Sequence, residues 1–279
     1  MFTIAVLTFK EALRRKLLLL TVLLTAAFLI LYTLGVREAA RHLPDIARHD
    51  PLIGSVLNSQ LLVLGLFFGN FIIVLMTIFA ATGAVSAEIE NGVLQTIVTR
   101  PVSRAAVIGG KYLGLAGLLL LYAVLFSGTV VGIVNHYTGV GVEGPLRALG
   151  LFCLVPLVLL AVTLLGSTLL PTLANGIAVF ALYVVGFVGG TVEQIGALID
   201  NAAMERIGII SSLVMPVDAL YRKMVAVLTA ASADPLAVLR QMGPMGSLSE
   251  PSIWMIVYTL LYAAVALALA VHVFGRRDL

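Results

Sequence analysis

Charged residues gather between Glu88 and Lys111, in the stretch EIENGVLQTIVTRPVSRAAVIGGK, which separates two long apolar runs. Glu88 and Glu90 open this stretch, and Arg100 and Arg104 follow. Such charges offer electrostatic contacts to a soluble partner protein. One hypothesis is that the stretch is a lever gripped by a soluble motor. The alternative is an ordinary solvated loop.

Motifs for nucleotide or metal chemistry are absent from the sequence. The nearest approach to a phosphate-binding loop lies around Gly110 and Lys111, but Ala105 stands where the first glycine belongs and Tyr112 follows the lysine. No His-Glu-x-x-His motif occurs. We therefore expect no ATP hydrolysis, no metal site and no cofactor in this chain, and we expect that it is not an enzyme. The small net charge of +3 makes nucleic acid an unsuitable partner.

The charged stretch is typical of two helices separated by a proline. Apolar residues recur at helical spacing in the first helix, namely Ile89, Val93, Leu94 and Ile97. Carboxylates at its start and Arg100 at its end suit the helix dipole. Pro101 stops this helix, because its ring cannot continue the backbone ladder. Ser103 is a suitable N-cap for a second helix that continues through Lys111 into the next apolar run.

The composition is that of an integral membrane protein. Hydrophobic residues make up 61% and charged residues 11% of the 279 residues, against roughly 25% charged residues in an average soluble domain. Six apolar runs are long enough to cross a hydrocarbon core of ~30 Å, at about 17–36, 61–85, 112–134, 148–170, 174–192 and 253–271. We therefore predict an all-α integral membrane protein with six transmembrane helices, forming a single domain over residues 1–279. Pro156 is expected to kink the fourth span.

The six runs contain no Asp, Glu, Lys or Arg. Coupling to protons or ions through membrane helices normally needs such groups, so a pump or a secondary transporter is disfavoured. Weakly polar residues inside the runs are expected to form hydrogen bonds across helices, and they are Asn70, Thr77, Thr82, Ser127 and Thr163. Glycine pairs four residues apart allow close helix approach, including at a dimer seam, and they are Gly65/Gly69, Gly128/Gly132 and Gly186/Gly190.

Basic residues near the ends of the runs predict the orientation. They gather densely in short segments on one side, at Lys10, Arg14, Arg15, Lys16, Arg100, Arg104, Lys111, Arg276 and Arg277. This side is assigned to the cytoplasm, which places both termini inside the cell. Residues 1–16 are expected to form an amphipathic helix along the inner membrane face, with Phe2, Val6, Phe9 and Leu13 on its apolar stripe.

Two segments on the outer side carry distinct patterns. Residues 37–60 are expected to be a solvated surface segment, in which Pro44 interrupts any helix and two histidines, His42 and His49, are too few for a metal site. In the large outer loop, 193–252, Pro216 opens a predicted helix with an apolar stripe, and its charged residues Asp218, Arg222 and Lys223 lie elsewhere on that helix. A second short helix is expected from Asp234.

The charged stretch also resembles a segment of a known family. The pattern acidic–x–acidic–x–Gly–x–Leu, then Arg–Pro–x–x–Arg, then Gly–Lys, is similar to the loop between the second and third spans of ABC-2 type permeases. In that family this loop is a coupling helix that docks on a separate ATPase subunit. The resemblance implies a coupling segment over 86–111, with the matching positions Glu88, Glu90, Gly92, Leu94, Arg100, Pro101, Arg104 and Lys111. Here Val93, Gln95 and Thr96 depart from the family's usual threonine and run of leucines.

The resemblance implies a function and its partners. The chain would be the permease subunit of an ABC-2 type exporter in a bacterial or archaeal cell membrane, as a homodimer bound to two copies of an ATPase that holds the ATP and magnesium. The first and fifth spans would line the pathway at the dimer seam, and short helices of the outer loop would form an outer gate. The uncharged runs suggest a hydrophobic or amphipathic cargo, or a purely mechanical role. The alternative from the residues alone is a membrane anchor or scaffold that recruits soluble partners and moves nothing.

Overall fold

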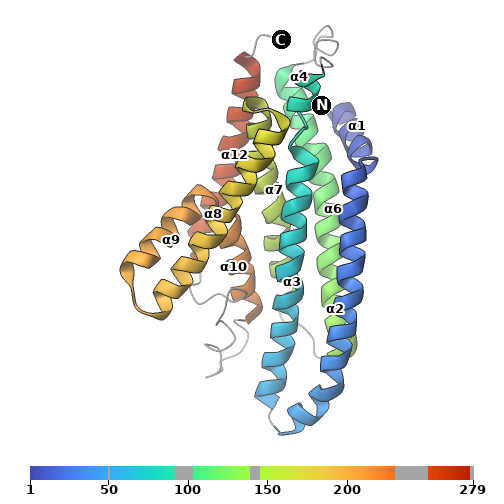
Figure 1. Ribbon diagram of the computed structural model, residues 1–279, viewed down its shortest axis with the longest axis vertical. Coiled ribbons are helices and arrows are strands. Elements are labelled where there is room, and N and C mark those ends of the chain that lie inside the picture. Colours follow the sequence, from blue (N-terminus) through green and yellow to red (C-terminus); the bar gives the residue numbers. More distant parts are fainter. Residues whose placement is uncertain (50, 92–102, 139–144, 230–250, 277–279) are drawn as a thin grey trace.

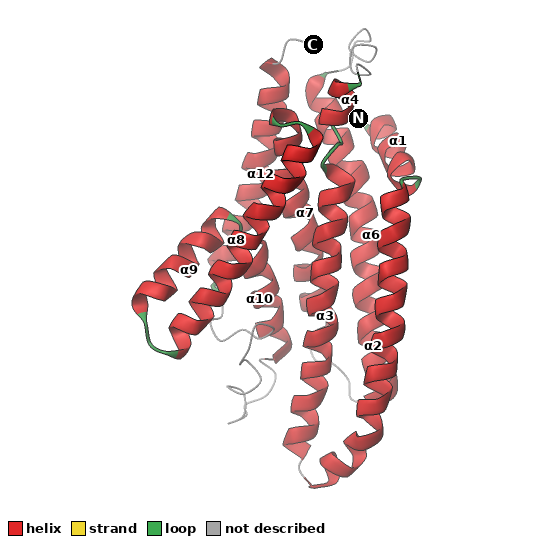
Figure 2. Cartoon of the chain, in the orientation of Figure 1, coloured by secondary structure: helices red, strands yellow, loops and turns green. Residues whose placement is uncertain are grey.

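A computed structural model describes residues 1–49, 51–91, 103–138, 145–229 and 251–276. Every regular element within these ranges is a helix, which confirms the prediction of an all-α membrane protein (Figure 2). Six stretches of helix in this part of the chain are long and apolar enough to cross a membrane, and each overlaps one predicted run. They are Lys16–Arg41, Ser59–Glu90, Arg104–Thr138, Leu146–Leu169, Thr172–Leu198 and Ile253–Arg276.

The helices form an elongated bundle (Figure 1). In chain order they are α1 (Phe2–Leu13), α2 (Lys16–His49), α3 (Pro51–Ala81), α4 (Ser86–Glu90), α6 (Arg104–Thr138), α7 (Pro145–Leu169), α8 (Thr172–Leu198), α9 (Ala202–Val214), α10 (Val217–Thr229) and α12 (Ile253–Arg276). The N-terminus, α4 and the last turn of α12 lie at one end of the bundle, called the terminal end below. The last turn of α2 and the first turn of α3 lie at the opposite end.

Residues 37–49 and 51–60 are helical, so the prediction that Pro44 interrupts the helix was wrong, whereas Arg37, Glu38 and Arg41 are exposed as expected of a surface segment. α2 continues through Pro44 to His49, and α3 begins at Pro51. Pro44 removes one backbone donor, but the helix continues on both sides of it. The two helices pack along each other, with the Tyr32 hydroxyl donating to the Leu61 carbonyl at 2.7 Å. Both helices extend beyond the apolar runs by which the sequence defined them.

The N-terminal helix α1 packs against α6, next to the start of the coupling segment's second helix. Gly110 and Gly114 of α6 make room for it, because a Cβ at Gly114 would lie 2.4 Å from the backbone oxygen of Ala5. Of the predicted apolar stripe, Phe2, Val6 and Leu13 are exposed, whereas Phe9 packs against α6. This arrangement agrees with a helix that shows an apolar face to lipid, which stays a prediction.

The main core lies between α3, α6, α7 and α10. The rings of Phe126 on α6 and Phe152 on α7 stack with their centres 6.3 Å apart, and both side chains are buried. α10 was correctly predicted as a helix opened by Pro216, and its apolar stripe is buried in this core. α9 was not predicted, and it packs back along α8 (Figure 1). The predicted helix from Asp234 lies outside the described residues.

The glycine pairs have different surroundings. A Cβ at Gly69 would lie 2.0 Å from the Phe126 ring, and one at Gly186 would lie 2.8 Å from the Met215 carbonyl oxygen, so these two pairs serve packing inside the chain. Nothing lies within 4 Å of a Cβ at Gly128 or Gly132. Of the three predicted pairs, Gly128 and Gly132 therefore form the one that is open on the surface of α6.

Candidate functional site

The described part of the coupling segment begins at a break in the second span. α3 ends at Ala81, residues 82–85 form turns, and α4 resumes at Ser86. In this junction the amide of Ala84 reaches back only three residues to Ala81, and the Thr82 hydroxyl donates to the Ile78 carbonyl. The junction therefore has carbonyl oxygens that need partners from outside the helix ladder.

Glu88 pairs with Lys111 inside the protein. The Lys111 Nζ lies 2.5 Å from the Glu88 Oε1 and also donates to the carbonyl of Ala84 at 2.5 Å. Only 5% of Lys111 is exposed. A buried ammonium needs a paired charge and hydrogen bonds, and this one has both. Glu88 and Lys111 thus join α4 and the α3–α4 junction to α6.

Glu90 lies at the start of α8. Its Oε1 accepts a hydrogen bond from the backbone N–H of Thr172 at 2.9 Å, and the Thr172 hydroxyl lies 2.8 Å from the hydroxyl of Ser86. Thr172 is the first residue of α8, whose free N–H groups and positive dipole end favour a carboxylate. Glu90 therefore joins α4 to the first turn of α8.

Arg104 makes a third connection at the terminal end. Its guanidinium Nη1 donates to the carbonyl of Phe274 at 2.9 Å and to that of Gly275 at 3.0 Å, both in the last turn of α12. The free carbonyls and negative dipole end of a helix favour a cation there. Ser103 caps the same stretch, because its Oγ accepts from the Ala106 N–H at 3.3 Å, as predicted.

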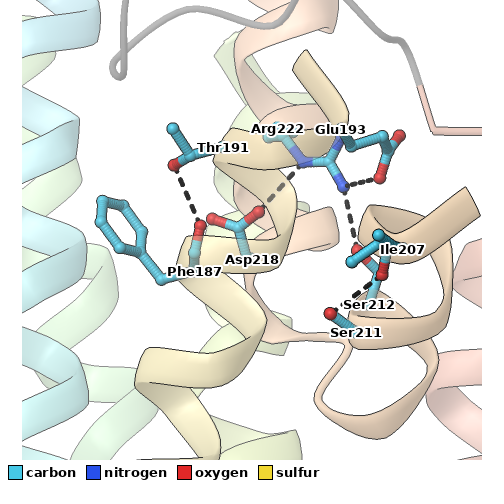
Figure 3. A network of polar contacts seen from close by, with 8 residues as sticks. All are labelled: Phe187, Thr191, Glu193, Ile207, Ser211, Ser212, Asp218 and Arg222. Carbon is cyan, nitrogen blue, oxygen red and sulfur yellow. Dashed lines mark hydrogen bonds and ion pairs between the residues drawn. The ribbon is translucent and has the colours of Figure 1, made fainter. Parts of the chain in front are cut away.

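A second polar cluster, called the Arg222 cluster, joins α8, α9 and α10 (Figure 3). The Arg222 Nη2 donates to Glu193 Oε2 at 2.8 Å and to the Ser212 hydroxyl at 3.1 Å, while its Nε donates to Asp218 Oδ2 at 3.0 Å. Arg222 is 2% exposed. Burial raises the pKa of the Asp218 carboxyl to about 6, because the loss of water outweighs the opposite effect of Arg222.

The whole chain fits one family. The family model of the ABC-2 family transporter protein matches residues 2–279. The chain belongs to this family. It is therefore a multi-pass membrane protein of the kind that forms the membrane part of a transporter, and such permeases work with an ABC ATPase subunit. A comparison with curated proteins found no match.

In this ABC-2 family protein the predicted coupling residues divide into two groups. Glu88, Glu90, Arg104 and Lys111 lie at the terminal end, and each bonds to another element. Gly92, Leu94, Arg100 and Pro101 lie outside the described residues. The described contacts of the two acidic residues lie inside the permease, and docking of the segment on an ATPase stays a prediction.

Two features of the permease escaped sequence reasoning. Glu193 belongs to α8 and Lys111 to α6, so the absence of charge from the predicted runs does not extend to the full helices. Asp218 and Arg222 were expected to lie away from the buried face of α10, and this was wrong. A signal was available, because Asp218, Tyr221, Arg222 and Val225 follow the i, i+3, i+4, i+7 spacing of a single helical face.

Polar side chains within the spans mostly serve their own helices. Thr77, Ser127 and Thr163 donate to carbonyls of their own helices, whereas Asn70 reaches the Tyr183 hydroxyl of α8 at 3.5 Å. The described residues contain no group of three or more His, Cys, Asp or Glu that suits a metal ion.

Proposed function

We propose that this chain is the permease subunit of an ATP-driven exporter, and that residues 86–111 pass the force of ATP hydrolysis from a separate ATPase to the spans. ATP and magnesium would bind the ATPase, and the permease itself would catalyse no reaction. Family membership over residues 2–279 supports the class of protein. The connections of the coupling segment support the mechanism.

The observation that carries the proposal is that the coupling segment is bonded to two other spans and that its two ends are bonded to each other. Glu90 bonds to α8 and Arg104 to α12, while Glu88 bonds to Lys111 at the other end of the segment. A solvated loop would need none of these bonds. A displacement of the segment by a docked ATPase would therefore move the terminal ends of several spans together, which is what a coupling element must do.

The terminal end is proposed to face the cytoplasm of a bacterial or archaeal cell. Lys10, Arg14 and Lys16 are exposed at this end, in keeping with the excess of basic residues on the inner side of membrane proteins. The same orientation places both termini and the coupling segment where a soluble ATPase can reach them.

Two permease copies are proposed to enclose the pathway for a hydrophobic or amphipathic cargo. α2 and α8, the first and fifth spans, carry large exposed apolar side chains, among them Leu23, Leu31, Ile177 and Val188. Either lipid or a second copy would cover these faces. A dimer seam along α2 and α8 would leave apolar walls for the cargo, and ATPase subunits would bind beneath, one for each permease.

The proposal is tested by co-expressing the chain with the ABC ATPase encoded beside it and reconstituting the purified complex in lipid vesicles. We expect a stable complex whose ATPase turnover differs several-fold from that of the free ATPase. Arg100→Glu, in the coupling segment, should weaken the complex or its response, whereas Arg147→Glu, exposed near the opposite end, should leave both unchanged. A stable complex with the turnover of the free ATPase would favour the membrane anchor instead, and no complex would contradict the proposal.

A further inference from the structure

The α3–α4 junction is held by side chains from two other spans. Asn175 of α8 donates from Nδ2 to the Thr82 carbonyl at 3.0 Å, and Lys111 of α6 donates to the Ala84 carbonyl at 2.5 Å. These are carbonyls of the residues at which the second span is interrupted. The break in the helix is thus compensated by hydrogen bonds that reach across the bundle.

Asn175 is fixed on several sides. It is fully buried, and its Nδ2 also donates to the Thr163 carbonyl of α7 at 3.0 Å. Gly166 of α7 leaves the space that the Asn175 side chain fills, because a Cβ at Gly166 would lie 2.0 Å from Asn175 Oδ1. At the next residue, a Cβ at Gly176 would lie 3.2 Å from the Thr82 side chain. The junction and the start of α8 therefore approach closely around one amide side chain.

A second set of bonds joins the same two elements beyond the junction. Glu90 accepts from the Thr172 N–H, and the hydroxyls of Ser86 and Thr172 lie 2.8 Å apart. α4 is thus bonded to α8 through Thr172 and, at the junction, through Asn175.

α8 also contributes Glu193 to the Arg222 cluster, towards its C-terminal end. Glu193 lies 18 residues after Asn175 on the same continuous helix, which corresponds to about 27 Å along the helix axis. The α8 helix therefore bears the bonds to α4 near one end and the bonds to α9 and α10 near the other.

We infer that α4 and the first turns of α8 form one rigid body, and that Asn175 is the positioning residue that makes α8 follow the movement of α4. Rotation or tilt of α8 then reaches α9 and α10 through Glu193. This inference rests on the proposed function, since it names the route by which an ATPase-driven displacement of the coupling segment travels. It assigns to the buried Asn175 a task that the coupling motif does not include.

A disulfide tests the rigid body directly. With Cys153 replaced by Ser, the double variant Ser86→Cys/Thr172→Cys places two thiols where the hydroxyls are 2.8 Å apart, a separation that a disulfide can bridge with little movement. If α4 and α8 move together, the oxidised complex should keep its permease-dependent ATPase turnover. Loss of that turnover on oxidation, with recovery on reduction, would overturn the inference, because it would mean that the two elements must separate.

Asn175→Leu tests the positioning role, with Thr77→Val as the matched control. Thr77 is equally buried and bonds only to its own helix. Nitroxide labels at the exposed Leu125 of α6 and Ile210 of α9 report the movement, with ATP and vanadate as the trigger. In the complex that still binds the ATPase, Asn175→Leu should abolish the distance change and reduce the ATPase response roughly five-fold or more, the lower range for coupled sites. Thr77→Val should keep both.

The outcomes separate the inference from the proposed function. An unmodified complex that fails to form, or that shows no nucleotide-driven distance change, would contradict the proposed function. An unmodified complex that responds normally, together with an Asn175→Leu complex that responds equally well, would contradict the inference alone. If Asn175→Leu does not yield a folded protein, the disulfide variant decides the question.

Discussion

Arg222 of α10 donates a hydrogen bond to Glu193 of α8 across 2.8 Å, although 29 residues separate them in the chain. Both are largely shielded from water, and Asp218 and Ser212 also accept hydrogen bonds from the guanidinium (Figure 3). Burial of charge costs free energy unless each group is paired and hydrogen-bonded. The cluster therefore fixes how α9 and α10 lie against α8 more than it adds net stability. Removal of one member should cost more free energy of unfolding than the whole cluster contributes.

The first prediction compares removal of the cation of the cluster with removal of one of its carboxylate charges. Arg222→Met should destabilise the protein by about 3–5 kcal/mol, because it leaves two buried carboxylates without their cation. Glu193→Gln should cost less, about 1–2 kcal/mol, because the amide oxygen can still accept from Arg222. Thermal melting of the purified protein in detergent measures both. Arg206→Met, on the exposed face of α9, is the control and should be nearly neutral. Equal losses for Arg206→Met and Arg222→Met would contradict the role of the cluster.

The second prediction is a dependence on pH. The folded-state pKa of Asp218 is raised from 3.8 to about 6 by burial. The folded protein therefore binds this proton more tightly than the unfolded chain, so the contribution of Asp218 to stability is greatest below about pH 4 and falls as the pH rises to 6. The melting temperature of the unmodified protein minus that of Asp218→Asn should fall across this range and then level off. A difference that grows with pH would mean that pairing with Arg222 dominates instead.

The third prediction compares two glycines. A Cβ at Gly190 of α8 would lie 1.9 Å from Asp218 Oδ2, so Gly190→Ala should displace the carboxylate and destabilise the protein by about 1–3 kcal/mol. Gly128→Ala on α6 meets nothing within 4 Å and should be neutral or stabilise the helix by up to ~1 kcal/mol. Melting of the two variants side by side gives the answer. Similar effects in both would show that the Arg222 cluster does not limit the approach of α8 and α10.

The spans could be predicted from the sequence because membrane crossing is a property of local composition. A run such as 112–134 must be about 20 apolar residues long whatever its neighbours are. The extension of α2 to His49 could not be read in the same way, since Pro44 and nearby arginines are typical of a helix end, and the pairing of α2 with α3 is not visible in one sequence.

The candidate site could be predicted only as a segment. The motif led to Glu88, Glu90, Arg104 and Lys111, and all four lie at the terminal end. Their partners could not be predicted, because Thr172 and Phe274 are 82 and 170 residues distant from the residues that bind them. Asn175 had no signal beyond being a polar residue after a proline turn. Its role depends on the carbonyls of a helix break that hydropathy does not reveal.

The fourth prediction concerns Glu88 and Lys111, which form an ion pair inside the permease. Lys111 holds both the Glu88 carboxylate and the Ala84 carbonyl, whereas Glu88 has the single partner Lys111 among the described contacts. Lys111→Met leaves a carboxylate and a junction carbonyl without their donor, so it should destabilise the protein by about 2–4 kcal/mol. Glu88→Gln keeps an acceptor for the ammonium and should cost about 1 kcal/mol.

The double variant Glu88→Gln/Lys111→Met should be more stable than Lys111→Met alone, since it no longer buries an unpaired carboxylate. Melting in detergent without any ATPase measures all three variants. If Lys111→Met melts like the unmodified protein and differs only when the ATPase is bound, the pair acts at the partner interface and not within the bundle.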